Sequence, residues 1–306
     1  MNKMLITSYT RPDLDGIACM IAYKEFLNET GKKAECAIHG VPQKEVLYVL
    51  DRLKIETPVL IETVIDDYDE IVLVDVSNLQ RVFEKVAIKK ILEVIDHRIT
   101  SHTDDYPDAE VKIEMVGSAA TLISERFEKS KVEISEPAAT LLYLAIISNT
   151  FNFKGKMTTE RDREMASWLK SKINIPSDFI HQMFVYKSEF DKPLADVLRE
   201  DLKTVYIKNK KVAMAQLEIL QVKGFVEKNL YELAAALKNI QEQEKSDYCF
   251  LNCVDLEEDF CAIIASDKLS RKVLTKALEL DFEGLVTKTE QIIQRKEIPP
   301  ALEKVL

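Results

Sequence analysis

Residues 10–16 read TRPDLDG, and they stand between an apolar run at residues 3–7 and an apolar helical pattern that begins at Ile17. The apolar run is typical of a buried strand, so the stretch is a strand-to-helix turn that carries Asp13 and Asp15. Two carboxylates at such a turn suit a hard divalent cation, which binds through oxygen. An aspartate before a helix is also a common N-cap. The choice between these interpretations depends on whether the chain supplies further ligands.

Two later apolar runs also end in polar side chains. Residues 70–75 read EIVLVD and residues 89–98 read KKILEVIDHR, which places Asp75 and His97 at strand ends. Taken alone, these residues would be a strand-end cap and a structural histidine. However, alternating strands and helices predict a parallel sheet with right-handed crossovers, whose ligand crevice lies at the carboxyl ends of the strands. Four candidate ligands fall at that rim: Asp13, Asp15, Asp75 and His97.

The chain is long enough for two domains, with 306 residues of which 46% are hydrophobic. After about residue 178 the pattern changes to an antiparallel hairpin, a long helix and two more strands. We therefore predict an α/β protein with an N-terminal parallel-sheet domain at residues 1–178 that has helices on both faces. A linker is expected at residues 179–190, and a smaller mixed-sheet α/β domain at residues 191–306.

The composition narrows the partners and the compartment. A formal net charge of −10 argues against general nucleic-acid binding and against binding to an anionic membrane surface. No segment reaches membrane-spanning length, and no export signal is recognised at the N-terminus. Five cysteines in apolar surroundings without a C-x-x-C pair indicate reduced thiols. We therefore expect a cytoplasmic protein.

These residues resemble the DHH phosphoesterase superfamily, and the whole chain is similar to family II, manganese-dependent inorganic pyrophosphatases and to exopolyphosphatase and prune proteins. The N-terminal motifs that carry the resemblance are PDLDG at 12–16, LVD at 73–75, DHR at 96–98, VGSAAT at 116–121, SNT at 148–150, and Thr158, Thr159 and Asp162. The C-terminal ones are LxxDLK at 198–203, KVAMAQ at 211–216 and RK at 295–296 before PP at 299–300. Relatives that cut oligonucleotides resemble one another in a glycine-rich C-terminal domain. With seven glycines, this chain lacks that domain.

The resemblance implies a two-metal site. One ion would be held by positions 9, 13, 75 and 149, and the other by positions 15, 75, 97 and 149. The implied catalytic residues are Asp13, Asp15, Asp75, His97 and Arg98, and the implied metal ligands are Asp13, Asp15, Asp75, His97 and Asn149. The implied phosphate-binding residues are Arg98, Lys203, Arg295 and Lys296. The cofactor would be Mn²⁺, with Mg²⁺ or Co²⁺ as alternatives, as one or two ions.

The resemblance also implies the reaction. Metal-activated water would cleave pyrophosphate or short polyphosphate in a cleft between the domains, and the chain could form a homodimer through its N-terminal domain.

Three positions depart from the pyrophosphatase pattern. Tyr9 and Arg98 stand where histidines are expected, and Asn149 stands where a bridging aspartate is expected. A neutral tyrosine and a single amide oxygen are poor ligands for a hard cation, so the Asp13 side should bind metal weakly. Asn149 could instead cap its helix. A weakened or inactive family member that binds a phosphorylated ligand or a protein partner is therefore the alternative function.

Overall fold

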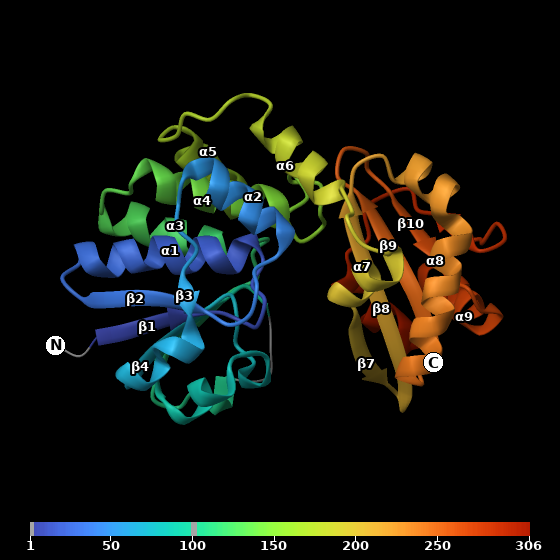
Figure 1. Ribbon diagram of the computed structural model, residues 1–306, viewed down its shortest axis with the longest axis horizontal. Helices are drawn as coiled ribbons and strands as arrows, with labels where there is room; N and C mark the ends of the chain where they lie inside the picture. The colour runs from blue at the N-terminus through green and yellow to red at the C-terminus, as the bar shows by residue number, and fades with distance from the viewer. Residues whose placement is uncertain (1–2, 99–102) are drawn as a thin grey trace. The chain divides into compact units, whose positions relative to one another are not determined.

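The computed structural model describes residues 3–98 and 103–306, which form two compact units (Figure 1). One unit comprises Met1–Phe153 and Met157–Met183, and the other Lys154–Lys156 and Phe184–Leu306. The boundary falls inside helix α6 (Phe179–Ser188), in the segment expected to be a linker. None of the helices within the described ranges combines the length and apolar character that a membrane span requires.

The N-terminal unit is built on one six-stranded sheet. Its strands lie in the order β3-β2-β1-β4-β5-β6, and every neighbouring pair is parallel. The strands are β1 (Lys3–Thr7), β2 (Lys33–Ile38), β3 (Val59–Leu60), β4 (Glu70–Val74), β5 (Lys90–Asp96) and β6 (Glu110–Ile113). The chain moves outward from β1 through β2 and β3, then returns to place β4 on the other side of β1. The parallel sheet predicted from the strand and helix alternation is therefore confirmed.

Helices cover one face of this sheet, as Figure 1 shows. They are α1 (Leu14–Glu29), α2 (Lys44–Leu53), α3 (Ala119–Ser130), α4 (Glu136–Asn149) and α5 (Glu160–Lys170). Helices α1 and α4 are apolar on nearly all sides. Helix α1 packs on the sheet and on α3 and α4, and α4 is surrounded by α1, α3 and α5. The opposite face buries an apolar cluster under short 3₁₀ helices that include η1 (Ile61–Thr63), η2 (Ile65–Asp67) and η4 (Glu84–Ile88). The helices expected on both faces are therefore α-helices on one face and short 3₁₀ helices on the other.

The C-terminal unit has a mixed sheet, as predicted. Its strands lie in the order β11-β10-β9-β8-β7, with β8 and β9 parallel and the other pairs antiparallel. The strands are β7 (Lys203–Ile207), β8 (Lys210–Ile219), β9 (Tyr248–Asp255), β10 (Cys261–Ile264) and β11 (Val286–Lys288). The helices are α7 (Leu194–Glu200), α8 (Val222–Glu244), α9 (Lys268–Leu278), η6 (Arg295–Glu297) and α10 (Ile298–Val305). The β7–β8 hairpin turns through Lys208 and Asn209, both with positive φ.

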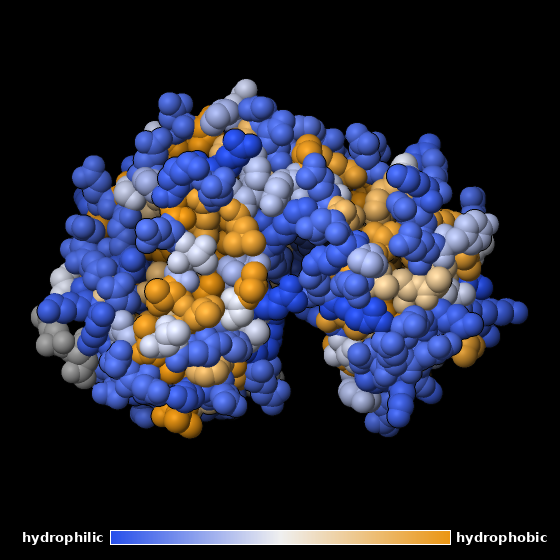
Figure 2. Space-filling view, viewed as in Figure 1, coloured by the Kyte–Doolittle hydropathy of each residue, from blue (hydrophilic) through white to orange (hydrophobic). Residues whose placement is uncertain are grey.

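Apolar side chains are exposed at the β3 edge of the N-terminal sheet. Figure 2 shows hydrophobic colour over the region of α2 and β3. The exposed apolar residues of this region are Val41, Leu47, Val59 and Leu60. An unpaired strand edge with apolar neighbours is a surface on which another chain can pair.

Candidate metal centre

The acidic residues singled out in the sequence meet where the strand order reverses. Asp13 and Asp15 follow β1, and Asp75 follows β4, which is hydrogen-bonded to β1. His97 follows β5, the next strand along. In open parallel sheets, ligands bind outside the carboxyl ends of the strands at this switch point.

Three of these side chains form a compact buried cluster. Ligand atoms of Asp15, Asp75 and His97 all lie within 4.8 Å of one another, which makes the trio a group that could hold a metal ion. The His97 Nε2 atom lies 3.4 Å from Asp75 Oδ1 and 3.9 Å from Asp15 Oδ2. Two carboxylates and an imidazole are a donor set suited to Mn²⁺.

His97 is oriented by the atoms around it. Its Nδ1 lies 3.0 Å from the carbonyl oxygen of Val116, and a carbonyl can only accept, so Nδ1 carries the proton. Nε2 is therefore the ring nitrogen that could bind an ion, and it lies toward the two carboxylates. A metal-binding histidine is commonly held in this way by a hydrogen bond from its other nitrogen. Asp96 supports the same turn, because its carboxylate accepts from the His97 backbone N–H at 2.8 Å and from the Ser77 hydroxyl at 2.7 Å.

Asp75 shows why a cation fits this cluster. Its backbone adopts φ +54°, a left-handed conformation that aspartate tolerates better than most residues and that ends strand β4 with a sharp turn. The side chain is fully buried, and its Oδ2 atom has no hydrogen-bond partner among the described residues. A buried carboxylate oxygen without a partner is costly unless a cation pairs with it. The residues present therefore fit a divalent ion.

Asp15 is held at the N-terminus of helix α3. Its carboxylate accepts hydrogen bonds from the Ser118 hydroxyl and the Ala119 N–H at 2.8 Å, and from the Ala120 N–H at 2.9 Å. The Asn149 amide nitrogen donates to Asp15 Oδ2 at 2.9 Å and to the Gly117 carbonyl at 3.0 Å. The helix end stabilises the negative charge of Asp15 and fixes its direction.

On the other side of Asp75 the expected ligands have other partners. Asp13 caps helix α1, with Oδ1 accepting from the Gly16 N–H at 3.1 Å, so the cap interpretation is correct for this residue. The Tyr9 hydroxyl accepts from the Asp13 N–H at 3.1 Å. Arg98 Nη2 donates to Asp75 Oδ1. Metal binding by Asp13 and by Asn149 therefore stays a prediction.

Burial and charge shift the titration of these groups. Burial and the Asp75 carboxylate raise the pKa of Asp15 to about 7, and the same two causes raise the pKa of Asp13. Burial opposes ionisation of Asp75 as well, but the Arg98 guanidinium and His97 hold its pKa below its usual value. Burial raises the pKa of Tyr9 well above its usual value, so this phenol stays neutral at physiological pH.

These shifts predict a pH-dependent metal affinity. With a pKa of about 7, Asp15 is mostly protonated at pH 6, and a metal ion that binds there must displace the proton. We expect Mn²⁺ affinity to fall by about tenfold between pH 8 and pH 6, with proton release on binding. Calorimetric titrations in two buffers of different ionisation enthalpy would measure both quantities. Equal affinity at the two pH values would contradict the prediction.

Gly117 and Asp162 support the helix end that holds Asp15. Asp162 Oδ2 accepts the Gly117 N–H at 2.8 Å. A Cβ atom at Gly117 would lie 2.6 Å from Thr150 Cγ2 and 2.9 Å from Asp162 Oδ2. Both distances are too short for real contacts, so residue 117 must be glycine for this packing.

Gly117→Ala is expected to destabilise the protein by about 1–3 kcal/mol through overpacking. The matched control is Gly224→Ala in helix α8, where an added Cβ meets nothing within 4 Å. Because alanine favours helix over glycine, the control should be neutral or stabilising by up to about 1 kcal/mol. Urea unfolding of both variants measures the difference. Equal stability of the two would mean that residue 117 has room for a methyl group.

The predicted phosphate-binding residues of the C-terminal unit lie near one another in its fold. Lys203 begins β7, and Arg295 and Lys296 lie in η6. Arg295 Nη2 contacts Asp201 Oδ1 at 2.9 Å, two residues before Lys203. The backbone N–H of Arg295 donates to Gln216 on β8 at 3.1 Å. Their role in phosphate binding stays a prediction.

The sequence did not predict the donors that surround Asp15. The position of Ser118 before a helical pattern predicts only a helix cap, and the Ala119 and Ala120 amides carry no side-chain signal. The small residues after Gly117 are the one sequence feature that points to these donors, because only small side chains let a helix end approach a carboxylate closely.

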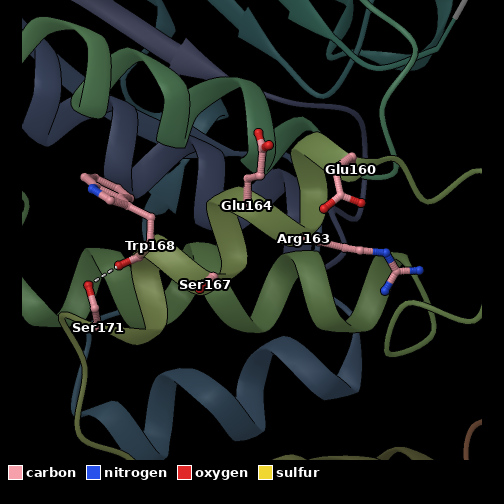
Figure 3. A pocket seen from close by; sticks show the side chains of 6 residues that line it. All are labelled: Glu160, Arg163, Glu164, Ser167, Trp168 and Ser171. Atoms are coloured by element: carbon pink, nitrogen blue, oxygen red, sulfur yellow. Dashed lines mark hydrogen bonds between the residues drawn. The ribbon is translucent and has the colours of Figure 1, made fainter.

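A surface depression along α5 lies apart from this cluster. Figure 3 shows its lining residues, Glu160, Arg163, Glu164, Ser167, Trp168 and Ser171. All of them come from α5 and its C-cap, and none belongs to the acidic cluster. A catalytic site usually combines side chains from several elements, and this depression does not.

Two family models match the chain. Residues 3–146 match the DHH family, N-terminal domain, and residues 181–305 match the DHHA2 domain, so together the matches span most of the sequence. The chain thus carries the two domains that these models describe.

Proteins similar to this chain are described as pyrophosphatases. A Bacillus velezensis protein assigned as a manganese-dependent inorganic pyrophosphatase is 29% identical over 307 residues, which cover 99% of this chain and 98% of that protein. The manganese-dependent inorganic pyrophosphatase of Bacillus subtilis is 28% identical over 306 residues, with the same coverage. A crystal structure from Methanococcus jannaschii, assigned to family II of the inorganic pyrophosphatases, superposes with a TM-score of 0.80 at 27% identity and covers 98% of both chains.

Proposed function

We propose that this protein is a manganese-dependent hydrolase of phosphoanhydride bonds that acts on pyrophosphate or short polyphosphate. The observation that carries the proposal is the cluster of Asp15, Asp75 and His97 at the switch point of the sheet. One buried oxygen of Asp75 has no hydrogen-bond partner among the described residues, and a bound cation would pair with it. The similarity to manganese-dependent pyrophosphatases over the full length of the chain supports it. A cytoplasmic location is part of the proposal, supported by five buried free thiols.

The residues of the centre have separable roles in this proposal. Asp15, Asp75 and His97 would hold the ion, which supplies Lewis-acid activation of water and neutralises phosphate charge when bound. Asp75 stays ionised because Arg98 pairs with it, and the Val116 carbonyl keeps His97 Nε2 as the ring nitrogen that could bind an ion. Arg98, with 28% of its side chain exposed, could also donate to a phosphate oxygen.

The C-terminal domain would supply further phosphate contacts. Lys203, Arg295 and Lys296 match basic positions of the related enzymes, and guanidinium and ammonium groups stabilise the charge that develops in phosphoryl transfer. We expect Lys203→Ala to weaken turnover, because the substrate would lose an ammonium group that contacts its phosphate. A homodimer through the exposed β3 edge also belongs to the proposal.

A direct assay tests the function. Phosphate release from pyrophosphate and tripolyphosphate should be measured with Mn²⁺, Mg²⁺ and Co²⁺, beside a His97→Gln variant. We expect release with Mn²⁺ that far exceeds both the metal-only background and the variant. Release no faster than background, from protein with a native circular dichroism spectrum, would sink the proposal.

A second candidate is a family member that binds a phosphorylated ligand without hydrolysing it. The observation that favours it is the Asn149 amide, which gives N–H donors to Asp15 where an aspartate would add a negative charge. Tyr9 is likewise neutral and hydrogen-bonded to the backbone of Asp13. Turnover that is negligible in the native chain and appears in the Tyr9→His, Asn149→Asp double variant would support this candidate. Equal turnover of the two proteins would reject it.

A further inference from the structure

The two carboxylate oxygens of Asp75 have different partners. Oδ1 accepts a hydrogen bond from Arg98 Nη2, whereas the buried Oδ2 has no partner in the described part of the chain. A carboxylate that bridges two ions must offer one oxygen to each. At Asp75 one of these oxygens already faces a permanent positive charge, because a guanidinium does not lose its proton in proteins.

The position of Arg98 is fixed by more than this ion pair. Nη2 also donates to the Asp75 carbonyl at 3.1 Å, and Nε donates to His97 Nε2 at 3.3 Å. Nε lies 3.6 Å from Asp96 Oδ1. The guanidinium carbon is 5.7 Å from the centre of the Tyr9 ring, within the range of a cation–π contact. Arg98 is thus held by four neighbours, unlike a mobile surface ion pair.

The charges at the centre agree with a single ion. Asp13, Asp15 and Asp75 carry three negative charges when ionised, and Arg98 carries one positive charge. The two negative charges that remain are the charge that one divalent ion neutralises. A second divalent ion would leave the buried centre with excess positive charge beside Arg98, and such an excess is costly where the surroundings are not water.

We propose that the Arg98 guanidinium takes the place of one of the two cations implied by the family pattern, so the centre binds one divalent ion. The three departures from the family pattern, Tyr9, Arg98 and Asn149, then compensate together for the missing ion. Arg98 supplies the charge, and Tyr9 supplies the ring face that contacts the guanidinium. Asn149 donates a hydrogen bond to Asp15, where an aspartate would need a second ion. The inference rests on the metal site of the proposed function.

Counting bound Mn²⁺ tests the inference. Metal-free protein is titrated with Mn²⁺, and the free ion is followed by its electron paramagnetic resonance signal. We expect one tightly bound ion in the native chain and one in the Tyr9→His, Asn149→Asp double variant, because Arg98 still occupies Asp75 Oδ1. Adding Arg98→His to that pair should raise the count to two. The control is Arg81→Gln, which removes a guanidinium 4.6 Å from the same Tyr9 ring and should leave the count at one.

The outcomes separate this inference from the proposed function. Two tightly bound ions in the native chain or in the double variant would overturn the inference. The absence of a tightly bound ion in the native chain would also overturn it, and so would a triple variant that still binds only one ion. If a variant does not fold, the number of ions bound by the native chain tests the inference by itself. A chain that releases phosphate while binding two ions keeps the proposed function and loses the inference. A chain that binds one ion tightly and releases no phosphate keeps the inference and loses the proposed function.

Discussion

Asp75→Asn is expected to lower Mn²⁺ affinity and pyrophosphate hydrolysis by more than about 100-fold. Even residues that only support a metal ligand cost about 10- to 100-fold when changed, and Asp75 is itself the central member of the cluster. Asparagine is the informative substitution because it tolerates the left-handed backbone of residue 75, so the fold should survive. Alanine there would add backbone strain to the loss of the ligand.

The matched control for this prediction is Asp96→Asn. Asp96 is also a buried aspartate at a strand end and also lies near Arg98, but it belongs to the support of His97 and not to the cluster. We expect its loss to stay between about 10- and 100-fold. Calorimetric titration with Mn²⁺ and phosphate release measure both variants. Asp75→Asn that binds Mn²⁺ as tightly as Asp96→Asn would contradict the assignment of Asp75.

Asp162→Ala is expected to reduce stability by about 3–5 kcal/mol, the largest loss for any single polar residue near the centre. Its buried carboxylate accepts from the Gly117 N–H, from the Thr121 hydroxyl at 2.6 Å, and from the N–H and hydroxyl of Thr159, both at 2.7 Å. Alanine leaves these donors buried without acceptors, at about 1–3 kcal/mol each before relaxation. The α3 end that holds Asp15 would also loosen, so Mn²⁺ affinity should fall with stability.

An ordinary helix cap provides the comparison for Asp162. The Ser135 hydroxyl caps α4 by accepting from the Ala138 N–H at 3.4 Å, and it donates to Glu25 Oε2 at 2.6 Å. Ser135→Ala should cost about 1 kcal/mol with unchanged Mn²⁺ affinity. Asp162→Asn should fall between the two, since its amide keeps one oxygen as an acceptor. Denaturant unfolding gives the three values. Asp162→Ala that is no less stable than Ser135→Ala would show that this network contributes little.

The parts of the fold that the sequence predicted are those set by local patterns. The pattern of residues 44–53 predicts a helix where α2 occurs, and Ser118 is a predicted cap where α3 begins. Thr158 or Thr159, with Asp162, predicts the start of α5, and the structure shows that Thr159 is the cap. Apolar periodicity and capping chemistry are written into neighbouring residues, so they can be read without the tertiary structure. The parallel order of the strands followed from their alternation with helices.

The short elements could not be predicted in the same way. Strands β3, β6 and β11 have four residues or fewer, and each exists because a neighbouring strand offers it hydrogen bonds. Helix α6 lies in residues 179–190, where the change of pattern after residue 178 indicated a linker. In each case tertiary contacts decide the structure more than local propensity does.

The same division applies to the candidate centre. Strand ends placed Asp15, Asp75 and His97 at one rim, and the structure brings these three together. The pairing of Arg98 with Asp75 and the amide donors around Asp15 come from turns that meet only in the folded chain. The resemblance placed Tyr9, Arg98 and Asn149 at the implied site. The structure adds their contacts, which are Arg98 with Asp75, Asn149 with Asp15, and Tyr9 with Arg98.

The most direct test of the account is the anomalous scattering of Mn²⁺ in crystals grown with the ion. We predict a strong manganese peak bounded by Asp75 Oδ2, the Asp15 carboxylate and His97 Nε2. A map without a peak among these three side chains, at a Mn²⁺ concentration that supports phosphate release, would contradict the assignment of the metal centre.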